Sequence, residues 1–117
     1  MSVIAITQST FHSVTSQPGI VFIDCWASWC QPCKMFRPIY DKAAEAHPDI
    51  TFGSVDTEAE VALSGELGIS AIPTIMAFRD GILVFSQAGA LRGPDFEQLI
   101  TKVQELDMTK VRAQAAA

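Results

Sequence analysis

The chain has 117 residues, the length of one ordinary domain, and its 49% hydrophobic and 18% charged residues favour a compact fold over disorder. Thirteen acidic against eight basic residues give a net charge of -5, which argues against binding to nucleic acid or to an anionic membrane surface, because both need a basic face. No apolar run approaches the ~18 residues of a membrane span.

The first half of the chain alternates short apolar segments with amphipathic ones, which is typical of an α/β domain. The predicted elements are a strand, a short helix, a central strand and a long helix, over residues 3–6, 7–16, 20–27 and 30–47. Residues 20–27 are apolar at both odd and even positions, as in a strand covered on both faces. Pro38 lies within the apolar stripe of the long helix, and because the stripe continues beyond it we expect a kink there.

The second half continues this alternation and closes it with a hairpin and a helix. Its predicted elements are a strand, a helix, two strands and a last helix, over residues 50–55, 57–67, 74–79, 82–87 and 93–106. Asp80-Gly81, between the two strands, is a strong hairpin signal. The sequence therefore predicts an α/β domain over residues 1–108, with a central mixed sheet of five strands flanked by four helices. Residues 109–117 lack a periodic apolar face, and we expect them to form a frayed tail.

Cysteine usage indicates redox chemistry. The three cysteines, Cys25, Cys30 and Cys33, are close together and odd in number, unlike those of a disulfide-stapled secreted scaffold. A structural zinc site usually brings two ligand clusters, and neither His12 nor His47 lies near the cysteines in sequence, so we expect no bound metal. A lone Cys-x-x-Cys pair remains, which is typical of a redox-active dithiol.

The Cys-x-x-Cys pair follows a predicted buried strand and opens a predicted helix. Cys30 would lie where unpaired backbone N–H groups and the helix dipole stabilise a thiolate, which makes it a nucleophile near neutral pH. Cys33 follows one turn later on the same side, so the two sulfurs could close a ring while Cys30 stays the more accessible. We infer that Cys30 attacks a target disulfide and that Cys33 resolves the resulting mixed disulfide.

Asp24 lies in the predicted central strand, where burial would raise the pKa of its carboxyl above the usual ~3.9. Such a carboxyl could exchange a proton with Cys33, which must lose one in a poorly solvated place. The alternative interpretation is a buried Asp that only orders the local backbone.

These residues resemble the thioredoxin family over nearly the whole chain, except for the first few residues and the tail after about Met108. The match is carried by the segment 24–34 with its Trp-Cys-Gln-Pro-Cys sequence, and by Pro38, Asp56, Ile72-Pro73-Thr74, Asp80-Gly81 and Gly89-Ala90. The resemblance implies the thioredoxin fold and protein-disulfide reductase activity, with Cys30 attacking, Cys33 resolving and Asp24 assisting proton transfer.

The resemblance also implies a surface that binds the substrate. Pro73 would be cis and would face the disulfide, exposing the backbone of Ile72 to an extended substrate segment. The apolar rim that receives partners would comprise Trp29, Ile72, Gly89 and Ala90.

Electrons and partners follow from the same resemblance. The chain would bind no cofactor, and NADPH would supply electrons through thioredoxin reductase. We expect a monomer that acts on protein disulfides. The stretch ahead of Lys34, the first basic residue, lacks the positive charge of a secretory signal, so we expect a cytoplasmic location. The alternative functions are a disulfide isomerase or oxidase, and a thioredoxin-fold binding or scaffold module.

Three positions depart from the family pattern. Gln31 stands where Gly is usual, beside the retained Pro32, and this dipeptide tunes thiolate stability and reduction potential. Phe52 stands where many relatives place a Lys, so we expect Asp24 to lack a cationic partner and to titrate at a higher pH. Cys25 is interpreted as a small buried hydrophobe, with a regulatory thiol as the alternative.

Overall fold

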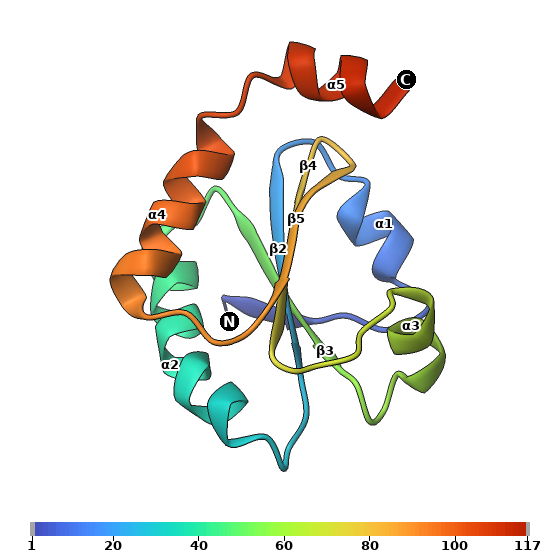
Figure 1. Ribbon diagram of the computed structural model, residues 1–117, viewed down its shortest axis with the longest axis vertical. Helices are drawn as coiled ribbons and strands as arrows, with labels where there is room; N and C mark the ends of the chain where they lie inside the picture. Colours follow the sequence, from blue (N-terminus) through green and yellow to red (C-terminus); the bar gives the residue numbers. More distant parts are fainter. Residues whose placement is uncertain (1, 117) are drawn as a thin grey trace.

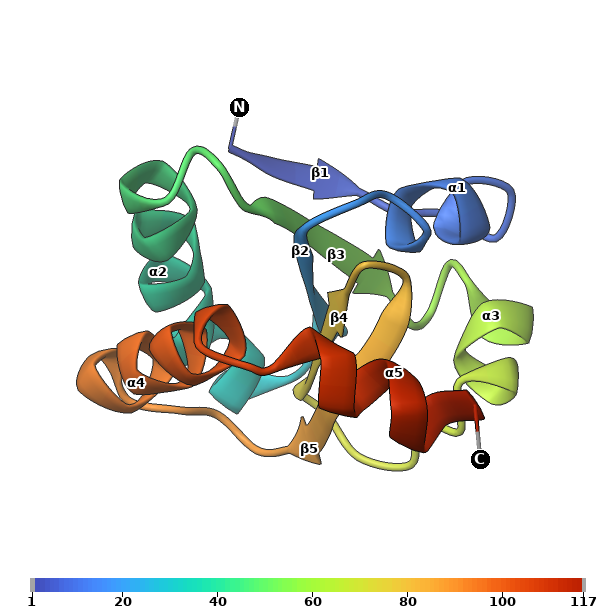
Figure 2. The same ribbon diagram turned by 90° about the horizontal axis from the view of Figure 1, so that it is seen from above.

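The computed structural model describes residues 2–116, and its helices and strands follow the order that the sequence predicts (Figures 1 and 2). The elements in chain order are β1 (Val3–Ala5), α1 (Phe11–Thr15), β2 (Ile20–Trp26), α2 (Gln31–Ala46), β3 (Thr51–Asp56), α3 (Val61–Glu66), β4 (Thr74–Arg79), β5 (Ile82–Ala88), α4 (Gly93–Gln104) and α5 (Met108–Ala116).

The five strands form one mixed sheet in the order β1-β3-β2-β4-β5. Strand β3 pairs in parallel with β1 and β2, whereas β4 pairs antiparallel with β2 and β5. Helices α2 and α4 cover one face of the sheet, and α1 and α3 cover the other (Figure 1). This arrangement confirms the predicted mixed five-stranded sheet and leaves β2 at its centre, covered on both faces.

Apolar side chains fill the space on each side of the sheet. On the α2 and α4 side, an aromatic cluster comprises Phe22, Phe36, Tyr40, Phe52 and Phe96, whose rings pack at centroid distances of 5.3–6.4 Å. The Tyr40 hydroxyl donates a hydrogen bond to the Gly53 carbonyl over 2.7 Å, so the one polar atom of this cluster is satisfied. On the other side, Val14 of α1 and Leu63 of α3 pack against β2 and β3.

Helix α3 begins at Val61 and is shorter than the predicted helix over residues 57–67. The Asp56 carboxylate accepts hydrogen bonds from the backbone N–H groups of Glu58 and Ala59, over 2.9 and 3.3 Å. Asp56 therefore closes a separate turn that precedes the helix.

The C-terminal segment forms a fifth helix, so the predictions of a frayed tail and of only four helices were wrong. Residues 108–116 form α5, and the Asp107 carboxylate accepts from the N–H groups of Thr109 and Lys110 over 3.0 and 3.4 Å. The segment is rich in Ala, Gln, Lys and Arg, which are strong helix formers, so an amphipathic face is not needed once a cap is present. Residue 117 of the predicted tail lies outside the described residues. None of the helices within residues 2–116 has the length and apolarity needed to cross a membrane.

Candidate functional site

The two cysteines lie where β2 passes into α2. Cys30 is the N-cap residue of α2, with an extended backbone, and its Sγ accepts a hydrogen bond from the Cys33 N–H over 3.2 Å. Cys30 and Cys33 are joined in a disulfide, with their Cα atoms 5.3 Å apart. The Cys33 N–H, in the first turn of α2, therefore points at the Cys30 sulfur, which is an environment that stabilises a thiolate after reduction.

The loop ahead of the cysteines is held by a contact that the sequence analysis missed. Ser28 donates from its hydroxyl to the Glu58 carboxylate over 2.9 Å, and so ties the loop to the segment between β3 and α3. These residues are far apart in sequence, and no local pattern could have paired them.

The exposed fractions of the two cysteines are equal at 3%, contrary to the prediction that Cys30 is the more accessible. The two residues differ instead in the space that they border. Cys30 lines an outer groove of about 640 Å³ together with Trp29 and Ile72. Cys33 lines an inner cavity of about 300 Å³ together with Asp24. In the disulfide state, the two cysteines are therefore equally buried, but Cys30 borders the outer groove and Cys33 borders the inner cavity.

Asp24 lies in the middle of β2, where it pairs with Ser54 of β3 and Ile75 of β4. Asp24 is 0% exposed, and neither of its carboxylate oxygens has a hydrogen-bond partner among the described residues. Burial raises the pKa of this carboxyl from 3.8 to about 7, against the attraction of the Arg37 guanidinium, while the Asp41 carboxylate adds a smaller upward effect. The predicted rise of the Asp24 pKa is thus confirmed, and it comes from desolvation first.

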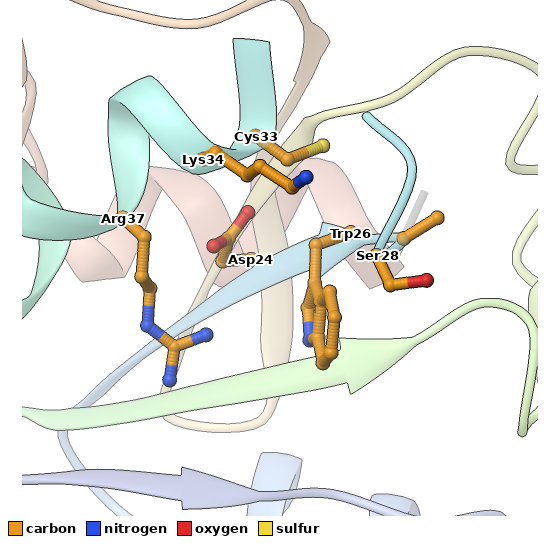
Figure 3. A pocket seen from close by; sticks show the side chains of 7 residues that line it. Asp24, Trp26, Ser28, Cys33, Lys34 and Arg37 are labelled. Atoms are coloured by element: carbon orange, nitrogen blue, oxygen red, sulfur yellow. The ribbon is translucent and has the colours of Figure 1, made fainter. Parts of the chain in front are cut away.

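A cation does lie at the Asp24 cavity, contrary to the prediction that Asp24 lacks one. Phe52 is buried in the aromatic cluster, as its apolar side chain requires, but Arg37 lines the cavity from α2 (Figure 3). Arg37 follows Cys33 by four residues, so it returns to the same face of α2 one turn later. The four-residue spacing from Cys33 was the sequence signal that could have placed Arg37 at the cavity.

Two residues of the predicted rim, Trp29 and Ile72, line the same groove as Cys30. Trp29 is 67% exposed, and Ile72 packs against the cluster that contains both cysteines. The Ile72–Pro73 peptide bond is cis, and the Gly89 N–H donates to the Pro73 carbonyl over 2.8 Å. Gly89 has a φ of +112°, which favours glycine, and Ala90 follows it on the surface. Gly89 is thus hydrogen-bonded to the residue that follows Ile72, and Ile72 itself packs against the cysteines.

Gln31 and Pro32 are the first two residues of α2, and both are exposed. Both border the outer groove next to Cys30. Pro32 lacks a backbone N–H at a position where a helix needs none. The Gln31 side chain therefore adds a polar amide to the wall of the outer groove, next to Cys30.

Cys25 lies on the opposite face of the sheet, among apolar side chains that include Val55 and Met76. It is fully buried, and burial raises the pKa of its thiol to about 12, with a smaller contribution from the Asp24 charge. A thiol with this pKa stays protonated near neutral pH and is a poor nucleophile. These features agree with the interpretation of Cys25 as a small buried hydrophobe.

Comparison with known proteins gives consistent matches over most of the chain. The family model described as Thioredoxin matches residues 2–105. A Streptomyces coelicolor protein provisionally named thioredoxin 2 is 45% identical over 115 residues, which cover 98% of this chain and 86% of that protein. Thioredoxin 1 of Synechococcus elongatus is 37% identical over 89 residues, covering 74% of this chain and 83% of its own length. The solved structure of a mutant thioredoxin from Halobacterium salinarum superposes with a TM-score of 0.81 at 30% identity, over 89% of this chain and 92% of that one.

Proposed function

Because this chain belongs to the thioredoxin family and is a protein-disulfide reductase, we propose that Cys30 is its attacking thiol, Cys33 its resolving thiol, and Asp24 the group that exchanges a proton with Cys33. The observation that carries this assignment is the disulfide at the start of α2, with one cysteine on the outer groove and the other on the cavity of a buried carboxyl.

The first step uses the reduced dithiol. The Cys30 thiolate, stabilised at the N-terminus of α2, attacks one sulfur of a substrate disulfide. A mixed disulfide forms between Cys30 and the substrate, and the other substrate sulfur leaves as a thiolate that takes up a proton from water. The outer groove beside Cys30 is the side from which a substrate reaches this sulfur.

The second step uses Cys33 and Asp24. Ionised Asp24 accepts the Cys33 proton, and the Cys33 thiolate attacks the Cys30 sulfur. The Cys30–Cys33 disulfide forms, the second substrate sulfur leaves as a thiolate, and the substrate has gained two electrons in all. Burial places the pKa of Asp24 at about 7, so the carboxyl can take and release a proton near neutral pH.

Substrate docking is assigned to the rim around the disulfide. Trp29 offers a large exposed apolar surface, and the backbone at Ile72, ahead of cis-Pro73, is available for pairing with an extended segment. Gly89 and Ala90 lie beside Pro73 without bulky side chains, which leaves room for a partner's backbone.

Turnover requires that the Cys30–Cys33 disulfide be reduced again. We assign this step to a thioredoxin reductase that draws electrons from NADPH, so that the chain carries electrons between two proteins and binds no cofactor. A dithiol that must stay reduced to act suits a reducing compartment, and we place the protein in the cytoplasm as a monomer.

The test is the reduction of insulin disulfides by dithiothreitol, followed by turbidity, with the wild-type chain and with the C30S and C33S variants. The wild type should accelerate the reaction, C30S should lose the acceleration, and C33S should accumulate as a mixed disulfide with insulin. Equal rates for wild type and C30S would contradict the assignment of Cys30. If mixed disulfides form with C30S and not with C33S, the two roles are reversed.

A further inference from the structure

An ion pair on α2 borders the cavity that Asp24 shares with Cys33. The Arg37 Nε donates to the Asp41 Oδ1 over 2.9 Å, one turn apart on the helix, and the two side chains are 35% and 49% exposed. Figure 3 shows Arg37 descending from α2 at one side of the Asp24 carboxylate, while Cys33 and Lys34 lie above it in this view. Through Arg37, this ion pair extends from the cavity of the buried Asp24 to the surface of α2.

The two members of the ion pair act on Asp24 in opposite directions. The Arg37 guanidinium lowers the pKa of Asp24, and the Asp41 carboxylate raises it. A pair whose net charge is zero thus exerts a net effect, because Arg37 itself reaches the cavity and Asp41 does not line it.

Other titratable groups near Asp24 are neutral at neutral pH or open to solvent. The groups near it are Cys25, the next residue of β2, whose side chain lies on the opposite face of the sheet, and Cys33, Lys34, Arg37, Tyr40 and Asp41 on α2. Burial raises the pKa values of Cys25 and Tyr40, so both stay protonated. The strand neighbours Ser54 and Ile75 carry no charge. Lys34 is exposed and screened by water.

We propose that the Arg37–Asp41 ion pair sets the pH range over which Asp24 takes the Cys33 proton, with Arg37 extending the resolving step to lower pH and Asp41 restricting it. This inference rests on the proposed roles of Asp24 and Cys33. Arg37 and Asp41 touch no reacting atom in it and are positioning residues for the charge on Asp24.

Two substitutions that break the same ion pair separate this role from a structural one. R37Q removes the attraction, so Asp24 should ionise at higher pH. D41N removes the repulsion, so Asp24 should ionise at lower pH. Both variants lose the same helix contact, which would change stability in the same direction. Opposite displacements are therefore the specific signature, and we expect each to be about 0.5 to 1 pH unit given the partial exposure of the pair.

Two measurements can detect these opposite displacements of the Asp24 titration. The first is the NMR titration of the Asp24 carboxyl carbon in the disulfide form. The second is the release of 2-nitro-5-thiobenzoate from a mixed disulfide on Cys30, formed at acidic pH and followed after a pH jump, which reports the resolving step alone. R37K, which keeps the charge, should titrate close to wild type in both.

The outcomes distinguish this inference from the proposed function. Midpoints displaced upward in R37Q and downward in D41N support it in both measurements. Unchanged midpoints, or displacements of the same sign, overturn it. If the NMR midpoints move and the release kinetics do not, Asp24 is not the base for Cys33, and the inference fails with that role. If D24N slows release while R37Q and D41N titrate like wild type, the role of Asp24 stands and only this inference fails.

Discussion

Asp24 is a carboxylic acid in the middle strand of the sheet, with no described residue hydrogen-bonded to its oxygens. Taking a carboxylate out of water without a compensating partner is unfavourable, so the charged form is penalised in the folded protein. The same burial brings the pKa of the carboxyl to about 7, where it can exchange protons near neutral pH. The burial on which the proposed proton-transfer role of Asp24 depends thus also weakens the fold.

This conflict predicts the pH dependence of stability at the residue scale. The pKa of Asp24 is about 7 in the folded chain, against the usual 3.8, so between these values the folded state binds more protons than the unfolded state. The contribution of Asp24 is most favourable below the lower value and is lost as pH rises through the upper one. D24N should therefore be more stable than wild type at about pH 8, by roughly 3 to 4 kcal/mol, and the gain should vanish near pH 4.

Urea denaturation of both oxidised proteins across this pH range measures the difference. R37K serves as a matched control, because it changes a charged cavity residue without removing the buried acid. A D24N advantage that does not change with pH would contradict the linkage, and an absent advantage at alkaline pH would show that Asp24 is not destabilised by burial.

At the scale of elements, Arg79 ties the sheet to the end of α4. Its Nη1 lies 2.7, 3.0 and 3.1 Å from the carbonyl oxygens of Val103, Gln104 and Leu106. Those carbonyls belong to the last turn of α4 and the link that follows, where backbone acceptors lack partners within the helix. A guanidinium there satisfies several acceptors and also faces the negative end of the helix dipole.

Removal of this cap should destabilise the protein more than loss of a surface charge does. R79M keeps much of the aliphatic stem but leaves the carbonyls without their donor, and we expect a loss of about 1 to 3 kcal/mol in the free energy of unfolding. R112M is the control, since Arg112 only approaches Asp80 at 3.7 Å on the surface and should contribute less than about 0.5 kcal/mol. Chemical denaturation of the two variants decides the point, and equal losses would count against the capping role.

At the scale of the whole molecule, α5 and the disulfide lie at opposite ends. Figure 1 places α5 beyond the β4–β5 hairpin, whereas α2 begins at the far end of the sheet. Helix α5 contacts β5, with Met108 buried and Val111 partly buried. It also lies outside the segment 2–105 that the family model matches. The helix therefore adds to the edge of the fold without reaching the site.

A chain that ends at residue 108 should accordingly remain a folded reductase. Loss of the Val111 contact and of the exposed Arg112–Asp80 pair should lower the free energy of unfolding by about 1 to 2 kcal/mol. Insulin reduction should proceed at the wild-type rate per molecule. The comparison uses thermal unfolding and the insulin assay on both chains, and a truncated chain that is folded but inactive would place α5 in the function.

The elements of this fold are largely readable from local sequence. Phe36, Tyr40, Ala43 and Ala44 recur at helical spacing along α2, and all four are buried. Asp80 and Gly81 both have positive φ, at 52° and 84°, as the hairpin signal requires. The two wrong predictions about these elements, the length of α3 and the frayed C-terminal tail, also have local causes. The Asp56 carboxylate closes a turn ahead of α3, and the Asp107 carboxylate caps α5, which has no apolar stripe.

By itself the sequence determined the chemistry of this protein: a Cys-x-x-Cys pair at a helix start, an acid in an apolar strand, and a proline ahead of a hairpin. Spacing along the chain specifies such features because backbone geometry and hydrogen bonding act over a few residues. Only the tertiary structure decided that Arg37 reaches the Asp24 cavity, that Glu58 holds Ser28, and that the cysteines differ in facing and not in exposure. These contacts depend on how separate elements pack around shared space, and their distances are fixed by side-chain packing across the sheet, which no local pattern records.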